Sequence, residues 1–429
     1  MKGVGEMRDA KRDAVDIFCE AVDAVLPEEA VRRALAGRPP PVGRRIVVAV
    51  GKAAWRMAAA AAEVLAGAFD GGIVVTKHGH AAGDIPGMEI HEAGHPVPDA
   101  ATFRATERAL ALTEGLTAAD EVVLLLSGGG SALFERPLPG VSPEDVARLN
   151  EALLASGAGI GEMNVLRKRF SAVKGGRFAA HCAPARIYQI VLSDVVGDRL
   201  ESIASGPACA DPATAAEAAR LVARYGIELT PRMAELLAEE TPKRADNVET
   251  VITGSVRELC RAAAAAAEKR GYRPCILATT VDCEAREAGR FVAALAREAV
   301  GGGSAFEPPC ALILGGETVV RLRGGGKGGR NQELALAAAE GLRGVFGATL
   351  LSAGSDGTDG PTNAAGGVVG GDTWNIIAAA GVDPLRALDD NDSWTALRAA
   401  DALVVTGPTG TNVNDLILAL CETRKAVES

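Results

Sequence analysis

The segment Arg45–Val50, RIVVAV, is followed by Gly51 and then by an alanine-rich stretch from Lys52 to about Ala66. A short apolar run rich in β-branched residues predicts a buried strand, and the alanine-rich stretch predicts a helix. The glycine between them lets the chain turn tightly from strand into helix. A buried strand that leads through a tight turn into a helix is the repeating unit of α/β proteins, so this segment indicates that class.

The same order recurs along the first half of the chain. Further strands are predicted at Gly72–Lys77, Met88–Ala93, Glu121–Ser127 and Arg186–Ser193. Helices are predicted from Ala14 to Val25, at Asp99–Gly115 with Asp99 as its cap, at Ser142–Gly157 and Ile160–His181, and twice within Asp211–Glu240. Strands that alternate with helices predict a mostly parallel, Rossmann-like sheet that is covered on both faces.

Length and a change of composition predict two domains. A chain of 429 residues exceeds the usual size of one domain. The polar, charged stretch Thr241–Asn247 marks a boundary, so we expect an N-terminal Rossmann-like domain at 1–245 and a smaller, mixed α/β domain at 246–429. In the second domain, Ala311–Arg323 is an apolar run interrupted by Gly315-Gly316, which predicts a strand, a tight turn and a second strand. The other strands expected there are Thr250–Gly254, Pro274–Thr279, Thr349–Ser352, Ala402–Val405 and Leu416–Leu420, with helices through Arg270, through Val300 and over Asn331–Leu342.

Charge and cysteine content exclude several classes of protein. The net charge is -10, which disfavours nucleic acid and anionic membranes as partners. The eight cysteines form no CxxC pair, so neither a zinc knuckle nor a disulfide framework is indicated. The charged N-terminus lacks an apolar signal core, and the apolar runs are too short to span a bilayer, so we expect a cytoplasmic protein.

Two glycine-containing turns in the first half are candidate anion sites, because ligands bind at the carboxyl ends of strands in open parallel sheets. Lys52 follows Gly51 after a strand, and we expect it in the first turn of the next helix, where it adds a positive charge for phosphate. The alternative is an ordinary surface lysine. The second turn contains Ser127, Gly128, Gly129, Gly130 and Ser131, whose N–H groups can form an anion nest; its alternative is a simple flexible turn.

Two further loops offer charged side chains. Asp194 follows an apolar strand and is placed to accept a proton, although an Asp in that position also commonly caps a turn. The run Gly324–Gly329 leads into a helix that begins near Arg330 and Asn331. A cation at that end opposes the helix dipole, which indicates a role in binding an anion. Glu317, after Gly315-Gly316, is a further candidate for this site.

The segment Ser352–Asn363 contains Asp356 and Asp359 among glycines and hydroxyl residues. Hard oxygen ligands of this kind suit Mg²⁺, and a chain of Asx turns is the alternative. The loop Thr406–Asn412 has a similar character and is a weaker candidate. The histidines match no spaced zinc motif, and the segment from His95 to Asp99 is interpreted as a shaped loop rather than a metal site.

Taken together, these segments resemble the type II glycerate kinase family, whose C-terminal part is called the MOFRL domain. The resemblance extends in order over almost the whole chain and rests on GKAAWRMA from Gly51, HPVPD from His95, SGGGSAL from Ser127, LSDVVGD from Leu192, GGRNQELAL from Gly328, SAGSDGTDGPTNAAGG from Ser352 and TGTNVNDL from Thr409. It implies an enzyme that uses ATP and Mg²⁺ to phosphorylate D-glycerate, usually at the 2-hydroxyl, with two α/β domains. It also implies catalytic roles for Lys52 and Arg330.

For phosphoryl transfer we assign roles on that basis. Lys52 and Arg330 would neutralise phosphoryl or carboxylate charge, and Asp194 would activate the substrate hydroxyl. The substrate and phosphate site would comprise Ser127, Gly128, Gly129, Gly130, Ser131, Glu317 and Asn331, and Asp356 and Asp359 would bind the metal. Two alternatives stay open: a hydroxypyruvate reductase, a label often given to this family, and a non-catalytic sugar-phosphate-binding regulator. A nicotinamide enzyme would need GxGxxG after a strand and an acidic residue about twenty residues further on, and this combination is not found; no basic DNA-binding module is present either. A homodimer is possible.

Overall fold

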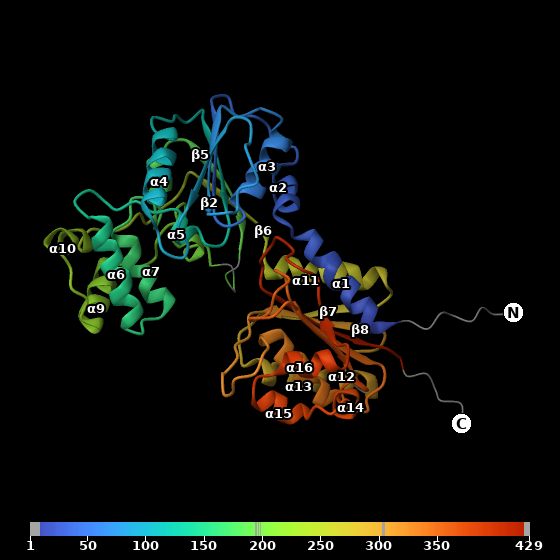
Figure 1. Cartoon of the computed structure of the whole chain (residues 1–429). Coiled ribbons are helices and arrows are strands. Elements are labelled where there is room, and N and C mark those ends of the chain that lie inside the picture. Colours follow the sequence, from blue (N-terminus) through green and yellow to red (C-terminus); the bar gives the residue numbers. More distant parts are fainter. Residues whose placement is uncertain (1–8, 194, 196, 198, 303–304, 424–429) are drawn as a thin grey trace, which may run out of the picture. The chain divides into compact units, whose positions relative to one another are not determined.

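The computed structural model describes residues 9–193, 195, 197, 199–302 and 305–423. The chain divides into two compact units, drawn in Figure 1. One is continuous and spans Pro27–Thr253, and we call it the parallel-sheet unit. The other combines the segment up to Leu26 with everything from Gly254 onward, and we call it the mixed-sheet unit. Among the described residues, no helix is both long and apolar enough to cross a membrane.

The parallel-sheet unit is built on six strands in the order β3-β2-β1-β4-β5-β6. Their bounds are β1 Arg45–Val50, β2 Gly71–Lys77, β3 Met88–Ala93, β4 Glu121–Leu126, β5 Arg186–Leu192 and β6 Val248–Gly254. Every residue of β1 and β4 is buried, as expected for strands covered on both faces. Since β1 pairs in parallel with both β2 and β4, the strand order reverses at β1.

The helices of this unit divide between the sheet and a separate small core. The full set is α2 Pro27–Leu35, α3 Ala54–Leu65, α4 Ala100–Leu112, α5 Gly130–Leu133, α6 Pro143–Ala155, α7 Ile160–Arg169, α8 Arg177–Cys182, α9 Ala215–Tyr225 and α10 Pro231–Leu237, with a 3₁₀ turn at Ile203–Ser205. Asp99 caps α4 through a capping box with Thr102, as its sequence predicts. Apolar faces of α6, α7, α9 and α10 pack on one another in a cluster that includes Leu153, Leu166 and Leu221.

One predicted helix of this unit is wrong. The segment Ile160–His181 forms two helices, α7 and α8, instead of one. Gly175 and Gly176, between them, have φ values of +59° and +82°, in the left-handed region that a helix interior excludes. The backbone of this connection bonds instead to the turn around Ser205, which receives the N–H of Gly175 at 3.0 Å.

The mixed-sheet unit has six strands in the order β11-β10-β9-β12-β8-β7. Their bounds are β7 Arg273–Val281, β8 Cys310–Gly316, β9 Ala348–Gly354, β10 Gly366–Gly370, β11 Leu403–Val404 and β12 Asp415–Cys421. Helices α1 Ala10–Ala24 and α11 Val256–Lys269 lie on one face of the sheet, and α12 Ala285–Gly301 and α13 Arg330–Leu342 on the other (Figure 1). The short helices α14 Thr373–Ala379, α15 Pro384–Asp389 and α16 Ser393–Ala399 pack beside α13 and are absent from the sequence prediction, as is β10.

The predicted hairpin within Ala311–Arg323 is also wrong. The chain forms β8 and then leaves the sheet at Glu317 without a second strand. The reason is that β8 already has a neighbour on each side, with β7 parallel to it and β12 antiparallel. No edge of β8 is therefore available for a hairpin partner.

Helices α12 and α13 approach closely at Gly289, where an added Cβ would lie 2.2 Å from the carbonyl oxygen of Leu334. We expect Gly289→Ala to lower the free energy of unfolding by about 1–3 kcal/mol, because the backbones must move apart. Gly301→Ala is the matched control, since a Cβ at that end of the same helix meets no atom within 4 Å. Urea unfolding of both variants checks this, and equal stabilities would contradict it.

Candidate functional site

The turns after β1 and β4 pack against each other. The N–H of Lys52 donates to the carbonyl oxygen of Gly128 at 2.9 Å, and the N–H of Ala53 donates to the Ser127 hydroxyl at 3.0 Å. Gly51 has φ of +127°, and a Cβ there would lie 2.2 Å from Ser127 Oγ. Only glycine at position 51 allows the two turns to approach this closely. Their contact lies where the strand order reverses, and open parallel sheets bind ligands at such a point.

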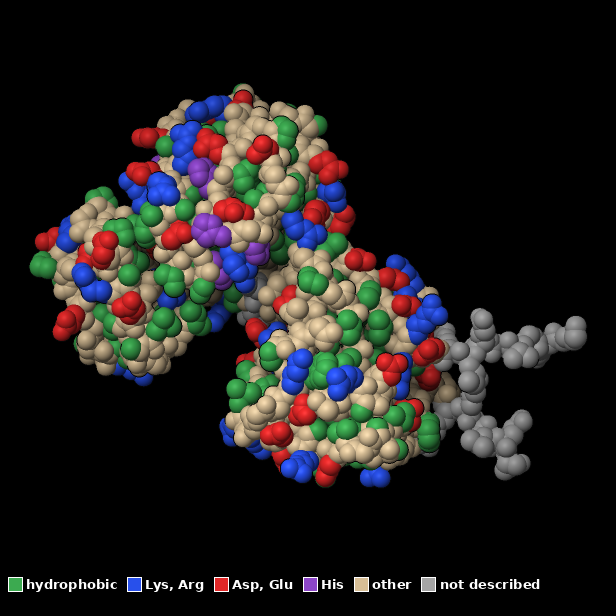
Figure 2. Space-filling model, in the orientation of Figure 1, with side chains coloured by type: hydrophobic (Ala, Val, Ile, Leu, Met, Phe, Trp, Pro, Cys, Tyr) green, Lys and Arg blue, Asp and Glu red, His purple; other side chains and the backbone are tan. Residues whose placement is uncertain are grey.

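Lys52 lies in the turn before helix α3, which begins at Ala54, and not inside the first helical turn as expected from the sequence. Its side chain is exposed. A Cβ added to Gly129 would lie 3.0 Å from the His95 ring and 3.2 Å from Lys52 Cε, so both side chains come to the β4 turn. Burial, and then the charge of Lys52, lower the pKa of His95. Figure 2 shows histidine side chains on the visible face of this unit.

The β4 turn offers donors that its own chain does not use. The N–H groups of Gly128, Gly129, Gly130 and Ser131 make no hydrogen bond to any residue that the structure describes. The Ser131 hydroxyl lies 2.9 Å from that of Ser205. A cluster of unpaired N–H groups next to a lysine is a suitable site for a phosphate or carboxylate.

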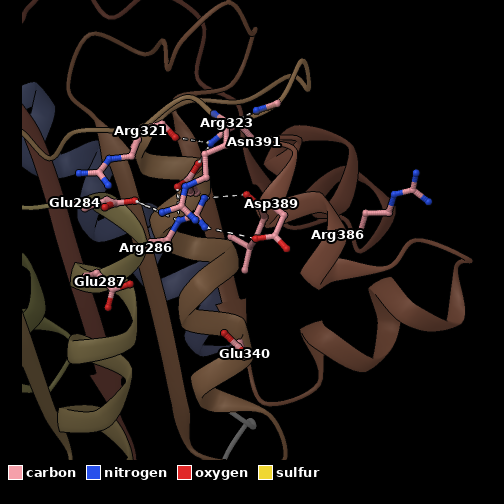
Figure 3. Close-up of polar contacts among 12 residues, drawn as sticks. Glu284, Arg286, Glu287, Arg321, Arg323, Glu340, Arg386, Asp389 and Asn391 are labelled. Atoms are coloured by element: carbon pink, nitrogen blue, oxygen red, sulfur yellow. Dashed lines mark hydrogen bonds and ion pairs between the residues drawn. The ribbon is translucent and has the colours of Figure 1, made fainter.

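The run Gly324–Gly329 has the opposite character. Asn391 Oδ1 accepts the N–H groups of Arg323 and Gly324, at 2.7 and 3.1 Å, and Asp390 and Asp392 accept those of the residues that follow. Asn391 is in turn held by Glu333 at 2.8 Å. In Figure 3 the buried guanidinium of Arg286 lies beside this cluster, and it donates to Glu333 at 2.9 Å. The N–H groups from Gly324 to Lys327 are therefore already engaged within this loop.

Arg330 stands at the first position of α13, as predicted, and is already paired with a carboxylate. Its Nε and Nη2 donate to the two oxygens of the buried Asp415 at 2.5 and 2.9 Å, and its Nη1 lies 3.3 Å from Glu317. Burial works against the Arg330 charge, but these acidic partners outweigh it and raise its pKa. Burial raises the pKa of Asp415, and Arg330 opposes that rise. The arrangement fixes the guanidinium plane beside the ends of β8 and β9.

Asp359 accepts hydrogen bonds from the start of the same helix. Its oxygens receive the backbone N–H of Asn331 at 3.2 Å and of Gln332 at 2.9 Å, and the Gln332 side chain adds another at 3.0 Å. Burial raises the pKa of Asp359 to about 6, against these donors. Asn331 is buried as well and accepts a hydrogen bond from Ser352 at 2.6 Å. Both residues thus support the N-terminus of α13.

Asp356 forms an Asx turn, in which Oδ1 accepts the N–H of Thr358 at 2.9 Å. Its other oxygen accepts no hydrogen bond from the described residues. Those residues contain no group of three His, Cys, Asp or Glu side chains arranged to hold a metal ion. Mg²⁺ commonly binds through one or two carboxylates and completes its coordination shell with water and substrate phosphate. The single carboxylate of Asp356 is therefore enough to fit such an ion.

The candidates fall into two groups, one in each unit. The parallel-sheet unit contains Lys52 and the segment Ser127–Ser131. The mixed-sheet unit holds Arg330, Glu317, Asn331 and both candidate metal ligands, Asp356 and Asp359. Asp194 lies outside the described residues.

The structure adds residues that were not among the predicted site residues. Asp415 is the main partner of Arg330, and His95 reaches the β4 turn. Glu135 and Lys174 form a buried ion pair next to the same turn. Asp415 and His95 lie in segments that carry the family resemblance, which was the only available signal for them; the Glu135–Lys174 pair has none, since its members are far apart in the sequence.

Comparisons with known proteins place the chain in a family. Residues 13–238 match a domain of unknown function, DUF4147, and residues 310–415 match the MOFRL family. A D-glycerate 2-kinase of Thermotoga maritima is 51% identical over 96% of this chain and 98% of its own. A putative hydroxypyruvate reductase of Agrobacterium vitis is 43% identical over 93% of this chain and 92% of its own.

The fold agrees with a solved structure. The crystal structure of the glycerate kinase from Thermotoga maritima superposes with a TM-score of 0.92 at 50% identity, covering 96% of this chain and 99% of that one. This confirms the predicted α/β fold class. The chain belongs to the glycerate kinase family that combines a DUF4147 domain with a C-terminal MOFRL domain.

Proposed function

We propose that this protein is a glycerate 2-kinase, which transfers a phosphoryl group from ATP to the 2-hydroxyl of D-glycerate and releases 2-phosphoglycerate. The observation that carries the proposal is the 51% identity, over nearly the full length of both chains, to a protein named D-glycerate 2-kinase. Phosphoryl transfer depends on positioning and on neutralising charge. The exposed lysine, the unpaired N–H groups of the β4 turn and the oriented arginine are groups suited to that task.

In the parallel-sheet unit, we assign phosphate binding to the N–H groups of Gly128 to Ser131, with Lys52 adding charge. Ser127 supports the turn that presents Lys52, since its hydroxyl accepts the N–H of Ala53. N–H donors that are fixed before the reaction cost no reorganisation when charge develops.

In the mixed-sheet unit, Arg330 is the proposed partner of a substrate carboxylate or phosphoryl oxygen. Asp415 holds Nε and Nη2, so Nη1, which among the described residues pairs only with the exposed Glu317, is the group proposed to meet the ligand. We propose that Asp356 would hold Mg²⁺, an ion that supplies positive charge for phosphate oxygens. Asn331 and Asp359 act indirectly, because their hydrogen bond holds the start of α13 in place. Asp194 remains our proposal for the group that accepts the proton of the 2-hydroxyl.

The alternatives have less support. The relative from Agrobacterium vitis carries the reductase name, but the turns after β1 and β4 contain no GxGxxG for a dinucleotide. The proposed kinase also needs no nucleic-acid or membrane partner, and we place it in the cytoplasm; a homodimer stays a prediction.

With ATP, Mg²⁺ and D-glycerate, we expect release of ADP and a product whose phosphorus NMR spectrum is that of 2-phosphoglycerate. A product that is wholly 3-phosphoglycerate would contradict the position of transfer. Oxidation of NADH in the presence of hydroxypyruvate, with no ADP formed from glycerate, would contradict the reaction class.

Replacing either proposed cation should slow catalysis, but only the loss of Arg330 should also lower stability. Lys52→Ala should slow turnover by about a hundredfold or more, with an unchanged melting temperature, because Lys52 is exposed. Arg330→Ala should slow turnover similarly and also lower the free energy of unfolding by about 3 kcal/mol, since it leaves buried Asp415 unpaired. Arg330→Lys keeps the charge but loses the planar fork, so turnover should recover only in part.

Turnover at 25 °C and thermal unfolding measure both effects. The control is Arg104→Ala, which removes an exposed cation of α4 in the same unit as Lys52. If Lys52→Ala and Arg330→Ala both turn over as fast as this control, the assignment of the two cations is wrong.

The two aspartates should behave differently. Asp356→Asn should raise the Mg²⁺ concentration needed for half-maximal activity, and leave stability unchanged. Asp359→Asn should lower the free energy of unfolding by about 1–3 kcal/mol, because an amide cannot accept all the donors of α13. Titration with Mg²⁺ measures metal binding, and urea unfolding measures stability. If Asp359→Asn changed only the Mg²⁺ requirement and Asp356→Asn only the stability, the two assignments would have to be exchanged.

The stability difference between the wild type and Asp359→Asn should also depend on pH. The folded pKa of Asp359, about 6, is above the ordinary 3.8, so the folded chain binds this proton more tightly than the unfolded chain. The contribution of the wild-type carboxyl is therefore greatest at low pH and falls as pH rises from about 4 to about 6. A difference that rises over this interval would show that the α13 donors outweigh burial.

A further inference from the structure

A cavity of about 360 Å³ opens beside the β4 turn, entirely within the parallel-sheet unit. One wall is the turn itself, at Gly129, Ser131 and Ala132, and another is the loop from His95 to Pro98. Helix α6 forms the third wall. Most of the lining is apolar and comes from Val97, Phe103, Val146, Leu149, Leu154 and Phe170.

A buried ion pair also lines the cavity. Lys174 Nζ donates to Glu135 Oε2, and the two residues are 2% and 4% exposed. The second oxygen, Glu135 Oε1, is buried and has no hydrogen-bond partner in the described part of the chain. An unpaired buried carboxylate oxygen costs free energy, and a ligand that donates a hydrogen bond to it removes that cost.

The cavity does not suit the phosphoryl acceptor. Glycerate has three carbons, each bearing oxygen, and would leave apolar walls of this extent uncovered. Cavities of a few hundred Å³ with apolar walls and a few convergent polar groups commonly hold ligands with a flat, apolar body. The β4 turn that lines this cavity carries the unpaired N–H groups proposed above as the phosphate site, and Asn150, Glu151 and Arg167 are further polar lining residues.

We propose that the cavity binds the base of the nucleotide donor, a purine with an exocyclic amine that donates to Glu135 Oε1, while the phosphates lie on the β4 turn. The inference rests on the proposed kinase function. It assigns nucleotide binding to the parallel-sheet unit, and it makes Glu135 a determinant of base preference. Lys174 holds Glu135 in place through their ion pair.

The test uses substitutions at exposed lining residues, where a larger side chain obstructs the cavity. Ala147 lines it from the solvent side of α6, and Ala155, an exposed alanine of the same helix, does not line it. Ala147→Trp should raise the KM for ATP at least tenfold, with the KM for glycerate unchanged, and Ala155→Trp should change neither. Leu154→Arg, at another exposed lining residue, is a second obstruction in case Ala147→Trp lowers the melting temperature.

A comparison of nucleotides tests the hydrogen bond to Glu135. ITP has no exocyclic amine, so its KM in the wild type should exceed that of the better of ATP and GTP by about tenfold or more. Equal KM values for the three nucleotides would overturn the role of Glu135.

The outcomes separate this inference from the proposed function. If both obstructing variants keep the wild-type KM for ATP, or raise only the KM for glycerate, the cavity is not the nucleotide site, although the kinase stands. If the wild type neither binds ADP in calorimetry nor phosphorylates glycerate, the proposed function itself fails.

Discussion

The insertion of β12 between β8 and β9 is the constraint on which the mixed-sheet unit depends. Because β12 runs antiparallel to both neighbours, its first residue, Asp415, lies opposite Gly316 and Gly354, at the ends of those strands. The carboxylate there is buried and needs a cation, and Arg330 supplies it. The sheet order therefore determines where the guanidinium lies and which of its edges is left for a ligand.

The start of α13 shows how one helix end can carry two opposite charges. Asp359 accepts the first N–H groups of the helix, where a negative charge is favoured. Arg330, at the same end, would be unfavourable alone, but its guanidinium turns back to Asp415. The unfavourable free energy of a cation at a helix N-terminus is thus offset by Asp415 within the protein, without a bound ligand.

The sequence predicted most of the parallel-sheet unit, because strict alternation of buried strands and helices leaves few other arrangements. It also located the two turns that pack at Gly51 and Ser127. It failed where neighbours in space decide the outcome. At Gly324–Gly329 the sequence indicated an anion site through Arg330, but the N–H groups of Gly324, Gly325 and Lys327 bind Asn391, Asp390 and Asp392, more than sixty residues further along the chain. The turn at Gly128–Ser131 keeps its N–H donors free of bonds to the described residues. The hairpin at Ala311–Arg323 failed for the same kind of reason, since both sides of β8 were already occupied.

The mixed-sheet unit is assembled from both ends of the chain. Its helix α1 precedes Pro27, and the strands it packs against, β9 and β12, follow the whole of the other unit. During synthesis the parallel-sheet unit is complete once its last strand has left the ribosome, whereas α1 must wait with its apolar face, including Phe18, unpaired. Contacts between residues so distant in sequence are slow to form, so docking of α1 should be a late step of folding. The insertion of one unit within the other thereby sets an order of folding, in which α1 is synthesised before the parallel-sheet unit and buried after it.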